Sequence, residues 1–201
     1  MTDEGYVKFQ ADWQPGPLLP SEALEELTYW RQRLYALGLI GTYDNGTGYG
    51  NISRRDGKGE QFIISGSATG NFSELTAAHY ALVTGVNVEA NTLLCRGPGI
   101  ASSESMSHAM VYRELPWVGG VIHVHHLGLW EALLHRAPTT DASATYGSPE
   151  MARSIVHLIR TTDLAERRIF VMEGHREGVF SFGATLAEAF EVLMQDFRAL
   201  K

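Results

Sequence analysis

The sequence predicts an α/β fold, a three-layer sandwich in which helices flank a central mixed, largely antiparallel sheet. Strand-like and helix-like segments are interleaved along the 201 residues, but without the regular strand–helix repeat of a parallel sheet. An apolar run over 121–126 has the character of a buried strand, and an amphipathic helix is expected over 186–200. A chain of this length is long enough to form one domain with a sizeable core.

The helical pattern is clearest over 21–39, where Leu24, Leu27 and Leu34 recur at helical spacing and glutamates lie near the start. We expect a single domain over 21–201, preceded by an N-terminal arm of residues 1–20 without regular structure. An arm that carries several prolines can become ordered against a neighbouring subunit.

The other elements follow from residue periodicity and from glycine-rich breaks between periodic segments. Helices are predicted over 102–112, 127–135, 148–160 and 186–200, with a single helical turn at 76–79. Strands are predicted over 51–54, 61–65, 80–84, 92–96, 121–126, 168–172 and 179–182.

Charge and cysteine content argue against several classes of protein. The formal net charge is −7 and the sequence has no run of lysines or arginines, so we expect no nucleic-acid partner. The single cysteine, Cys95, excludes an intramolecular disulfide and a cysteine-rich zinc site, and it fits a reducing, cytoplasmic compartment. No apolar run approaches the ~20 residues that span a bilayer, and residues 1–20 lack the pattern of a signal peptide, so no membrane partner is expected.

The strand predicted over 121–126 carries His123 and His125 on one face and His126 on the other. Two imidazoles on one face can share a metal ion, but they can equally be core histidines that bond to neighbouring groups. His175 is the best candidate for a third ligand, because glycine-flanked turns can aim a side chain. The other candidates have no partner at ligand spacing and are interpreted as surface or core residues: His79, His135 and His157.

The residues Ser102, Ser103 and Glu104 begin a predicted helix. The simpler interpretation is a serine N-cap followed by an acidic residue in the first turn. The alternative is an oxyanion held by the serine hydroxyls and the helix N-terminus, with Glu104 aimed at the substrate. His108 lies four residues after Glu104, on the same helix face, where it could orient the carboxylate.

Five short motifs follow one another along the sequence. They are Gly50-Asn51-Ile52-Ser53, Ile64-Ser65-Gly66-Ser67, Ser102-Ser103-Glu104, His123-Val124-His125 and His175. Each motif is weak by itself, whereas five in this order are specific. Together they resemble the class II aldolase/adducin family, in particular its fuculose-phosphate aldolase-like members, over about 34–193.

The resemblance implies a divalent-metal site, most simply Zn²⁺, formed by His123, His125 and His175. It implies that Glu104 is the acid/base and can also touch the metal. An oxyanion pocket would comprise Asn51, Ser65 or Ser67, Ser102 and Ser103. The resemblance also implies a homo-oligomer, usually a cyclic tetramer, with the site at a subunit interface.

The activity implied by the resemblance is aldol cleavage or condensation of a small hydroxy-ketone or sugar derivative through a metal-stabilised enediolate. Sugar-phosphate epimerase, dehydratase and a non-catalytic adducin-like scaffold remain as alternatives, as does the presence or absence of a phosphate group on the substrate. Two departures bear on this: the loop after Ser65 lacks the usual proline, and Arg176 follows the late histidine where the family usually has glycine. The second acid/base is unassigned among Asp141, Ser143 and Tyr146.

Overall fold

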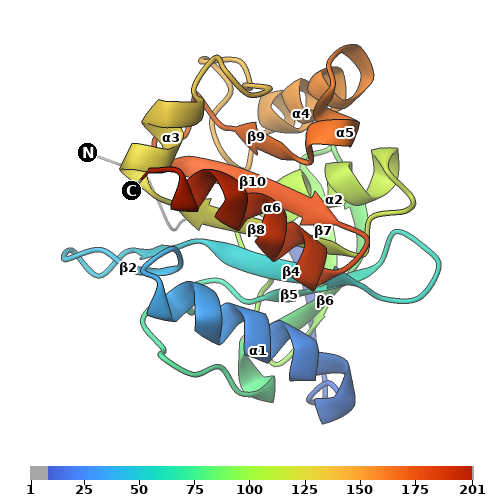
Figure 1. Cartoon of the computed structure of the whole chain (residues 1–201). Coiled ribbons are helices and arrows are strands. Elements are labelled where there is room, and N and C mark those ends of the chain that lie inside the picture. Colours follow the sequence, from blue (N-terminus) through green and yellow to red (C-terminus); the bar gives the residue numbers. More distant parts are fainter. Residues whose placement is uncertain (1–8, 201) are drawn as a thin grey trace.

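The computed structural model describes residues 9–200 and has a sheet at its centre (Figure 1). The eight strands of this sheet run in the order β1-β7-β6-β5-β4-β8-β10-β9. Only the β1–β7 pair is parallel, so the sheet is mixed and largely antiparallel, as predicted. The strands are β1 (Gln10–Pro15), β4 (Asn51–Arg55), β5 (Phe62–Ser65), β6 (Tyr80–Asn87), β7 (Thr92–Gly97), β8 (Gly120–His125), β9 (Ile169–Val171) and β10 (Gly178–Gly183).

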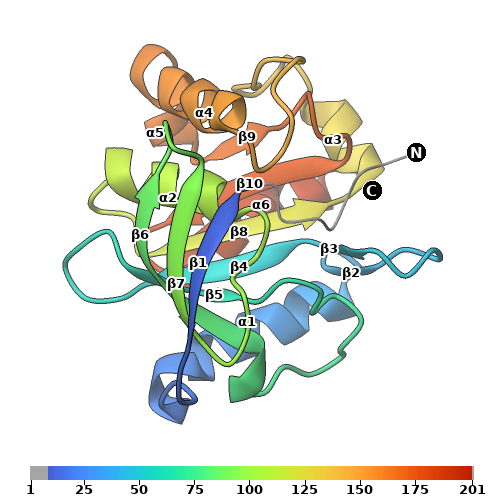
Figure 2. The same cartoon turned by 180° about the vertical axis from the view of Figure 1, so that it is seen from behind.

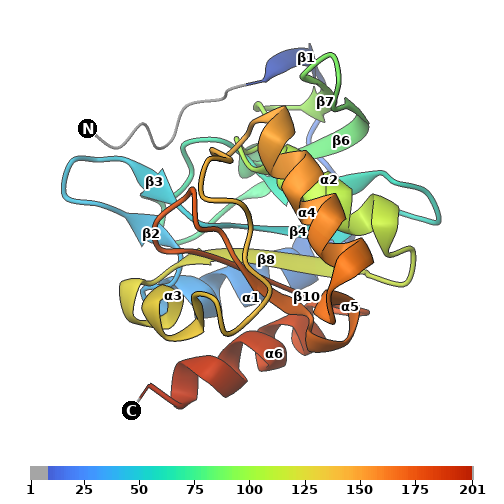
Figure 3. The ribbon, with the colours of Figure 1, turned by 90° about the horizontal axis from the view of Figure 1, so that it is seen from above.

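Helices cover both faces of the sheet, which confirms the three-layer architecture. Figure 3 shows α6 on one side of β8 and β10, with α2 and α4 on the other. The first face is covered by α1 (Ser21–Ala36), α3 (Leu127–Leu133) and α6 (Leu186–Arg198). The second is covered by α2 (Ser105–Glu114), α4 (Pro149–Thr161) and the short α5 (Leu164–Arg167). A short hairpin, β2 (Gly41–Thr42) and β3 (Gly48–Tyr49), and the 3₁₀ turn η1 (Ala77–His79) complete the elements.

Two separate apolar cores result, one on each face of the sheet. Leu27 of α1 and Leu193 of α6 pack beneath one face, and Met106 of α2 and Ile155 of α4 pack beneath the other. The six residues of β8 are all buried, because this strand lies between β4 and β10 and is covered on both faces. In the described part of the chain, no helix is long and apolar enough to cross a membrane.

The expectation that residues 1–20 have no regular structure is wrong for Gln10–Pro15. These residues form β1, which pairs in parallel with β7 at the edge of the sheet, as Figure 2 shows. Trp13 reinforces the pairing by donating its indole N–H to the Gly97 carbonyl at 3.0 Å. Prolines can occupy edge strands because one side of the strand has no ladder partner, so the proline content did not exclude a strand here. Residues 1–8 of the predicted arm lie outside the described residues.

The helix predicted from Ser102 begins three residues later, at Ser105. The Ser102 hydroxyl oxygen accepts the Glu104 N–H at 3.3 Å, and the Ser102 carbonyl accepts the Ser105 N–H at 3.0 Å. Glu104 is therefore the residue immediately before the helix rather than a member of its first turn. This places the carboxylate at the end of α2 that adjoins the cavity described below.

Candidate metal centre and anion pocket

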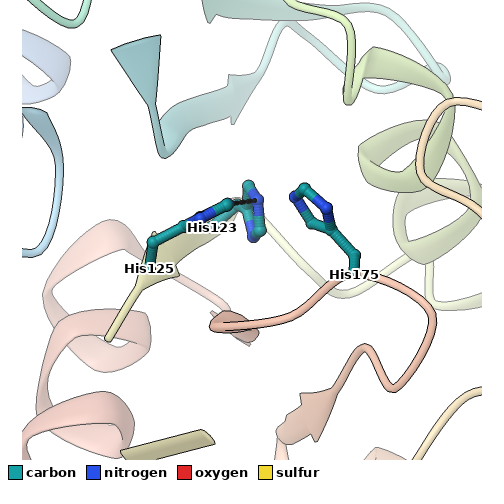
Figure 4. Close-up of side chains that lie close together, drawn as sticks. All are labelled: His123, His125 and His175. Carbon is teal, nitrogen blue, oxygen red and sulfur yellow. Dashed lines mark hydrogen bonds between the residues drawn. The ribbon is translucent and has the colours of Figure 1, made fainter. Parts of the chain in front are cut away.

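Three histidine side chains converge at one end of β8 (Figure 4). His123 and His125 alternate onto the same face of this strand, while His175 comes from the turn between β9 and β10. The three rings offer ligand atoms that all lie within 4.8 Å of one another, and the Nε2 atoms of His123 and His125 are 3.0 Å apart. The structure thus brings together the three residues that the sequence singled out.

All three imidazoles are buried, and burial favours the neutral form of His123 and His125. Desolvation lowers the pKa of His123 well below its usual value, and the neighbouring histidines lower it further. Desolvation and the nearby His175 likewise lower the pKa of His125. Neutral imidazole is the form that ligates a metal ion, since its unprotonated nitrogen supplies the lone pair.

Hydrogen bonds at Nδ1 of His123 and His125 determine which nitrogen of each ring carries the proton. His123 Nδ1 lies 3.3 Å from the Val179 carbonyl, which can only accept, so the proton is on Nδ1. Tyr43 donates its hydroxyl to Glu177 at 2.8 Å, and His125 Nδ1 lies 2.9 Å from the same hydroxyl oxygen. With Nδ1 of His125 as the donor, both Nε2 atoms present lone pairs to each other.

Two facing lone pairs at 3.0 Å repel unless a cation lies between them. Zinc–nitrogen bonds of about 2.0–2.1 Å fit ligand nitrogens at roughly this separation, and three protein ligands leave a further position open. The donor atoms of His123, His125 and His175 could together hold a divalent metal ion. Tyr43 and Glu177 orient the His125 ring from behind, in the way that outer groups usually hold metal-ligating imidazoles.

Glu104 lies beside this cluster and is almost completely buried. Its Oε2 accepts a hydrogen bond from the Ser107 hydroxyl at 2.8 Å, and its Oε1 is 3.8 Å from His175 Nε2. The expectation that His108 orients this carboxylate is wrong. His108 instead lies 2.6 Å from Asn51, because its ring extends toward β4, and the residue that holds Glu104 is Ser107.

A polar cavity of about 200 Å³ opens in front of the histidines and Glu104. The candidate oxyanion-binding residues that line it are Asn51, Ser67, Ser102 and Ser103. Ser102 uses an oxygen lone pair to accept the Glu104 N–H, so its own hydroxyl hydrogen can point elsewhere. No lysine or arginine is among the described residues that line the cavity.

The loop after β5 is positioned by buried groups rather than by a proline. Arg31 of α1 donates to the Ser73 and Thr69 carbonyls at 3.0 and 3.1 Å, and burial lowers the pKa of its guanidinium. Ser65 does not face the cavity, because its hydroxyl oxygen accepts the Ile52 N–H at 3.2 Å. The Ser67 N–H donates to the Ile100 carbonyl, and Ser67 itself lines the cavity.

The three candidates for a second acid/base are placed differently. Asp141 is exposed, and its carboxylate accepts the N–H and hydroxyl of Ser143, which lower the pKa of the Asp141 carboxyl. Neither residue lines the cavity. Tyr146 does line it, and its ring centroid is 4.7 Å from that of His175. Arg176 is exposed and lies outside the cavity lining.

The model of the Class II Aldolase and Adducin N-terminal domain matches residues 25–195. The chain belongs to the class II aldolase/adducin family. Solved structures with the same fold include an L-fuculose 1-phosphate aldolase, with 19% identity, a TM-score of 0.67, and coverage of 91% of this chain and 84% of that one. A second is the L-fuculose-1-phosphate aldolase from Thermus thermophilus, with 22% identity, a TM-score of 0.58 and coverage of 87% and 85%.

A third is the sugar-phosphate aldolase from Thermotoga maritima, with 20% identity, a TM-score of 0.64 and coverage of 90% and 92%. At these sequence identities, the similarity to the three solved structures shows the fold alone. The family membership confirms the resemblance that the five motifs indicated.

Some residues around the cluster carry no signal in the sequence. Tyr43 and Glu177 lie 134 positions apart in the chain and meet only through the fold. Arg31 resembles any charged residue of an amphipathic helix, although its side chain is only 1% exposed. Such groups act through position rather than through a motif, so no local pattern predicts them.

Proposed function

We propose that this protein is a divalent-metal-dependent lyase that cleaves or forms a carbon–carbon bond in a small hydroxy-ketone or sugar derivative. The observation that carries the proposal is the convergence of three buried imidazoles with the buried Glu104 at one end of a polar cavity. Zn²⁺ is the metal we propose, because three nitrogen ligands with an open position suit it. Such a metal acts as a Lewis acid that stabilises negative charge on substrate oxygens.

The protein groups around the cavity have distinct roles in this proposal. Glu104 carries the proton to or from the reacting carbon, and the Ser107 hydroxyl holds its carboxylate in place. The hydroxyls of Ser67, Ser102 and Ser103, with the Asn51 amide, bind an oxyanion of the substrate, such as a phosphate group.

We propose further that the protein acts as a homotetramer in the cytoplasm. Family membership supports a cyclic assembly with the cavity near a subunit interface. The single, buried Cys95 is compatible with a reducing compartment. The scaffold alternative is disfavoured because all three metal-ligand positions are occupied by histidines.

A screen of candidate substrates in which the products are identified tests the proposed class of reaction. Small hydroxy-ketones, each with and without a phosphate group, would be incubated with the purified protein, and aldehyde release would be followed. A chelator should abolish turnover and added Zn²⁺ should restore it. Turnover that persists in protein shown to contain no metal would contradict the proposal. Epimerised or dehydrated product without aldehyde would instead favour the epimerase or dehydratase alternative.

A further inference from the structure

A chain of buried hydrogen bonds runs behind the cavity from Asn51. His108 Nε2 lies 2.6 Å from Asn51 Oδ1, and His108 Nδ1 lies 2.7 Å from the Ser53 hydroxyl. The Ser53 hydroxyl in turn lies 2.8 Å from that of Tyr112. His108 is completely buried, with its ring against those of Phe62 and Phe180. Four polar side chains thus form one connected network between β4 and α2.

The chemistry of these groups determines which one donates and which one accepts in each hydrogen bond of the network. A carbonyl oxygen can only accept, so Nε2 of His108 carries the hydrogen that bonds Asn51 Oδ1. A neutral imidazole has one N–H, and Nδ1 must therefore accept the Ser53 hydroxyl hydrogen. The Ser53 oxygen then accepts the hydroxyl hydrogen of Tyr112. Desolvation lowers the pKa of His108 to about 3, so the ring stays neutral over the usual working range of pH.

The direction of these hydrogen bonds determines which atom of the Asn51 amide faces a ligand in the cavity. Asn51 faces His123 across the β4–β8 ladder, and its side chain lines the cavity. Because Oδ1 is bound by His108, the amide nitrogen Nδ2 is the atom left for the cavity. We propose that His108 is a positioning residue that holds the Asn51 amide with its N–H donors toward the oxyanion of the substrate. This inference rests on the oxyanion pocket of the proposed function.

The alternative orientation of Asn51 would be harmful to anion binding. If the amide turned over, Oδ1 would face the cavity and repel a negatively charged group. Asparagine alone has no strong preference between its two orientations, since its two branches are nearly equal in shape. A fixed donor at Nε2 of His108 removes this ambiguity.

The tautomer of His108 can be measured without any ligand. Long-range ¹H–¹⁵N correlation spectra of histidine-labelled protein identify which ring nitrogen carries the hydrogen. The proposal predicts a neutral His108 with its hydrogen on Nε2. A hydrogen on Nδ1 would overturn it, because Nε2 would then accept from the amide nitrogen and turn Oδ1 toward the cavity. This measurement is independent of the proposed reaction.

The second measurement is the affinity for inorganic phosphate in three variants and the wild type. His108→Phe keeps a ring of similar size but removes the donor, so affinity should fall roughly 10- to 100-fold. His108→Gln can supply an N–H near the former Nε2 and should stay within about threefold of the wild type. Tyr112→Phe perturbs the far end of the same buried network but leaves the His108–Asn51 bond, and should bind phosphate normally.

Melting temperatures of the same preparations separate folding from positioning. A folded His108→Phe protein with wild-type phosphate affinity would overturn the proposal. So would a loss of affinity in Tyr112→Phe equal to that in His108→Phe, since the effect would then be general destabilisation. If the wild type bound no phosphate, the oxyanion part of the proposed function would fail, and the tautomer spectrum would still decide the role of His108.

Discussion

At the scale of single residues, the charge states of the histidines and of Glu104 in this site have different physical causes. His123 and His125 are kept neutral because desolvation disfavours their charged form, and neutral rings can ligate a metal. The buried carboxylate of Glu104 is held by the Ser107 hydroxyl and lies near His175. A divalent cation at the three histidines would favour the ionised form of Glu104, which is the form that accepts a proton.

Glu104→Gln should abolish most turnover while the fold and most of the metal are retained. Gln is nearly isosteric but cannot accept the proton, and general acid–base catalysis typically contributes ~10²–10⁴-fold. Metal content, melting temperature and activity would be measured on one preparation. Loss of metal would show that Glu104 is mainly a ligand. Near wild-type activity with a stability loss of ~1 kcal/mol or less would show that it is only an acidic residue at a helix end.

The buried His108 should make folding stability depend on pH. Its pKa is about 3 in the folded protein, against an ordinary value near 6.5, so the unfolded chain binds more protons between these values. The contribution is therefore fully present above about pH 6.5 and is lost as pH falls toward 3. Below pH 6.5 the free energy of unfolding should fall by up to about 1.4 kcal/mol per pH unit from this residue.

Denaturant unfolding between pH 7.5 and 5, compared with His108→Gln, isolates this contribution because the other histidines titrate in both proteins. The wild type should lose stability more steeply on acidification. Parallel curves for the two proteins would show that His108 is not buried in its neutral form.

At the scale of elements, much of the architecture could be predicted because local patterns are strong. The apolar run over 121–126 and the leucine spacing over 21–39 correspond to β8 and α1. Two features could not be predicted locally. The strand Gln10–Pro15 exists only because β7 offers an edge, and α2 begins late because Ser102 bonds to the Glu104 N–H.

The candidate site likewise contains residues that a local sequence pattern predicts and residues that it does not. His123 and His125 follow from strand periodicity, and His175 from its glycine-flanked turn, so a pattern in the sequence points to each. The role of His108 was misjudged because helix spacing shows which residues share a face, whereas the bonds actually formed depend on the neighbouring strand. Tyr43 and Arg31 contribute through long-range contacts that spacing does not reveal.

The turn that carries His175 depends on a close approach between two backbone segments. A Cβ added at Gly174 would overlap the Ala144 carbonyl, so Gly174→Ala should displace the turn and weaken metal binding at least about tenfold. Gly59→Ala is the matched control, because a Cβ there meets nothing within 4 Å. Zinc affinity would be measured by competition with a chelating dye. Equal affinities in both variants would show that the turn adjusts without moving His175.

At the scale of the whole molecule, part of the surface has features of a buried interface. A cleft of about 490 Å³ lies between β6, α2 and α4. Its floor is apolar, with Val86, Met110 and Val156, while Arg113 and Arg160 at its rim pair with Glu60 and Glu114. An apolar floor with a charged rim is the usual composition of a surface that associates with another subunit.

If the proposed tetramer forms, light scattering at micromolar concentration should give a mass well above that of a dimer and about four times the subunit mass. Val156→Glu would place a charge on the cleft floor and is expected to shift the mass downward if this cleft is an interface. A monomeric wild type that binds metal and turns over substrate would contradict the oligomer proposal.

The central claim is that His123, His125 and His175 hold a metal ion. Elemental analysis of protein purified without added metal tests it most directly. We expect about one divalent ion per subunit in the wild type. The matched control is His157→Ala, which removes an exposed histidine on α4 and should retain the ion. His123→Ala and His175→Ala should lose most of it. Equal metal content in all four proteins would contradict the account.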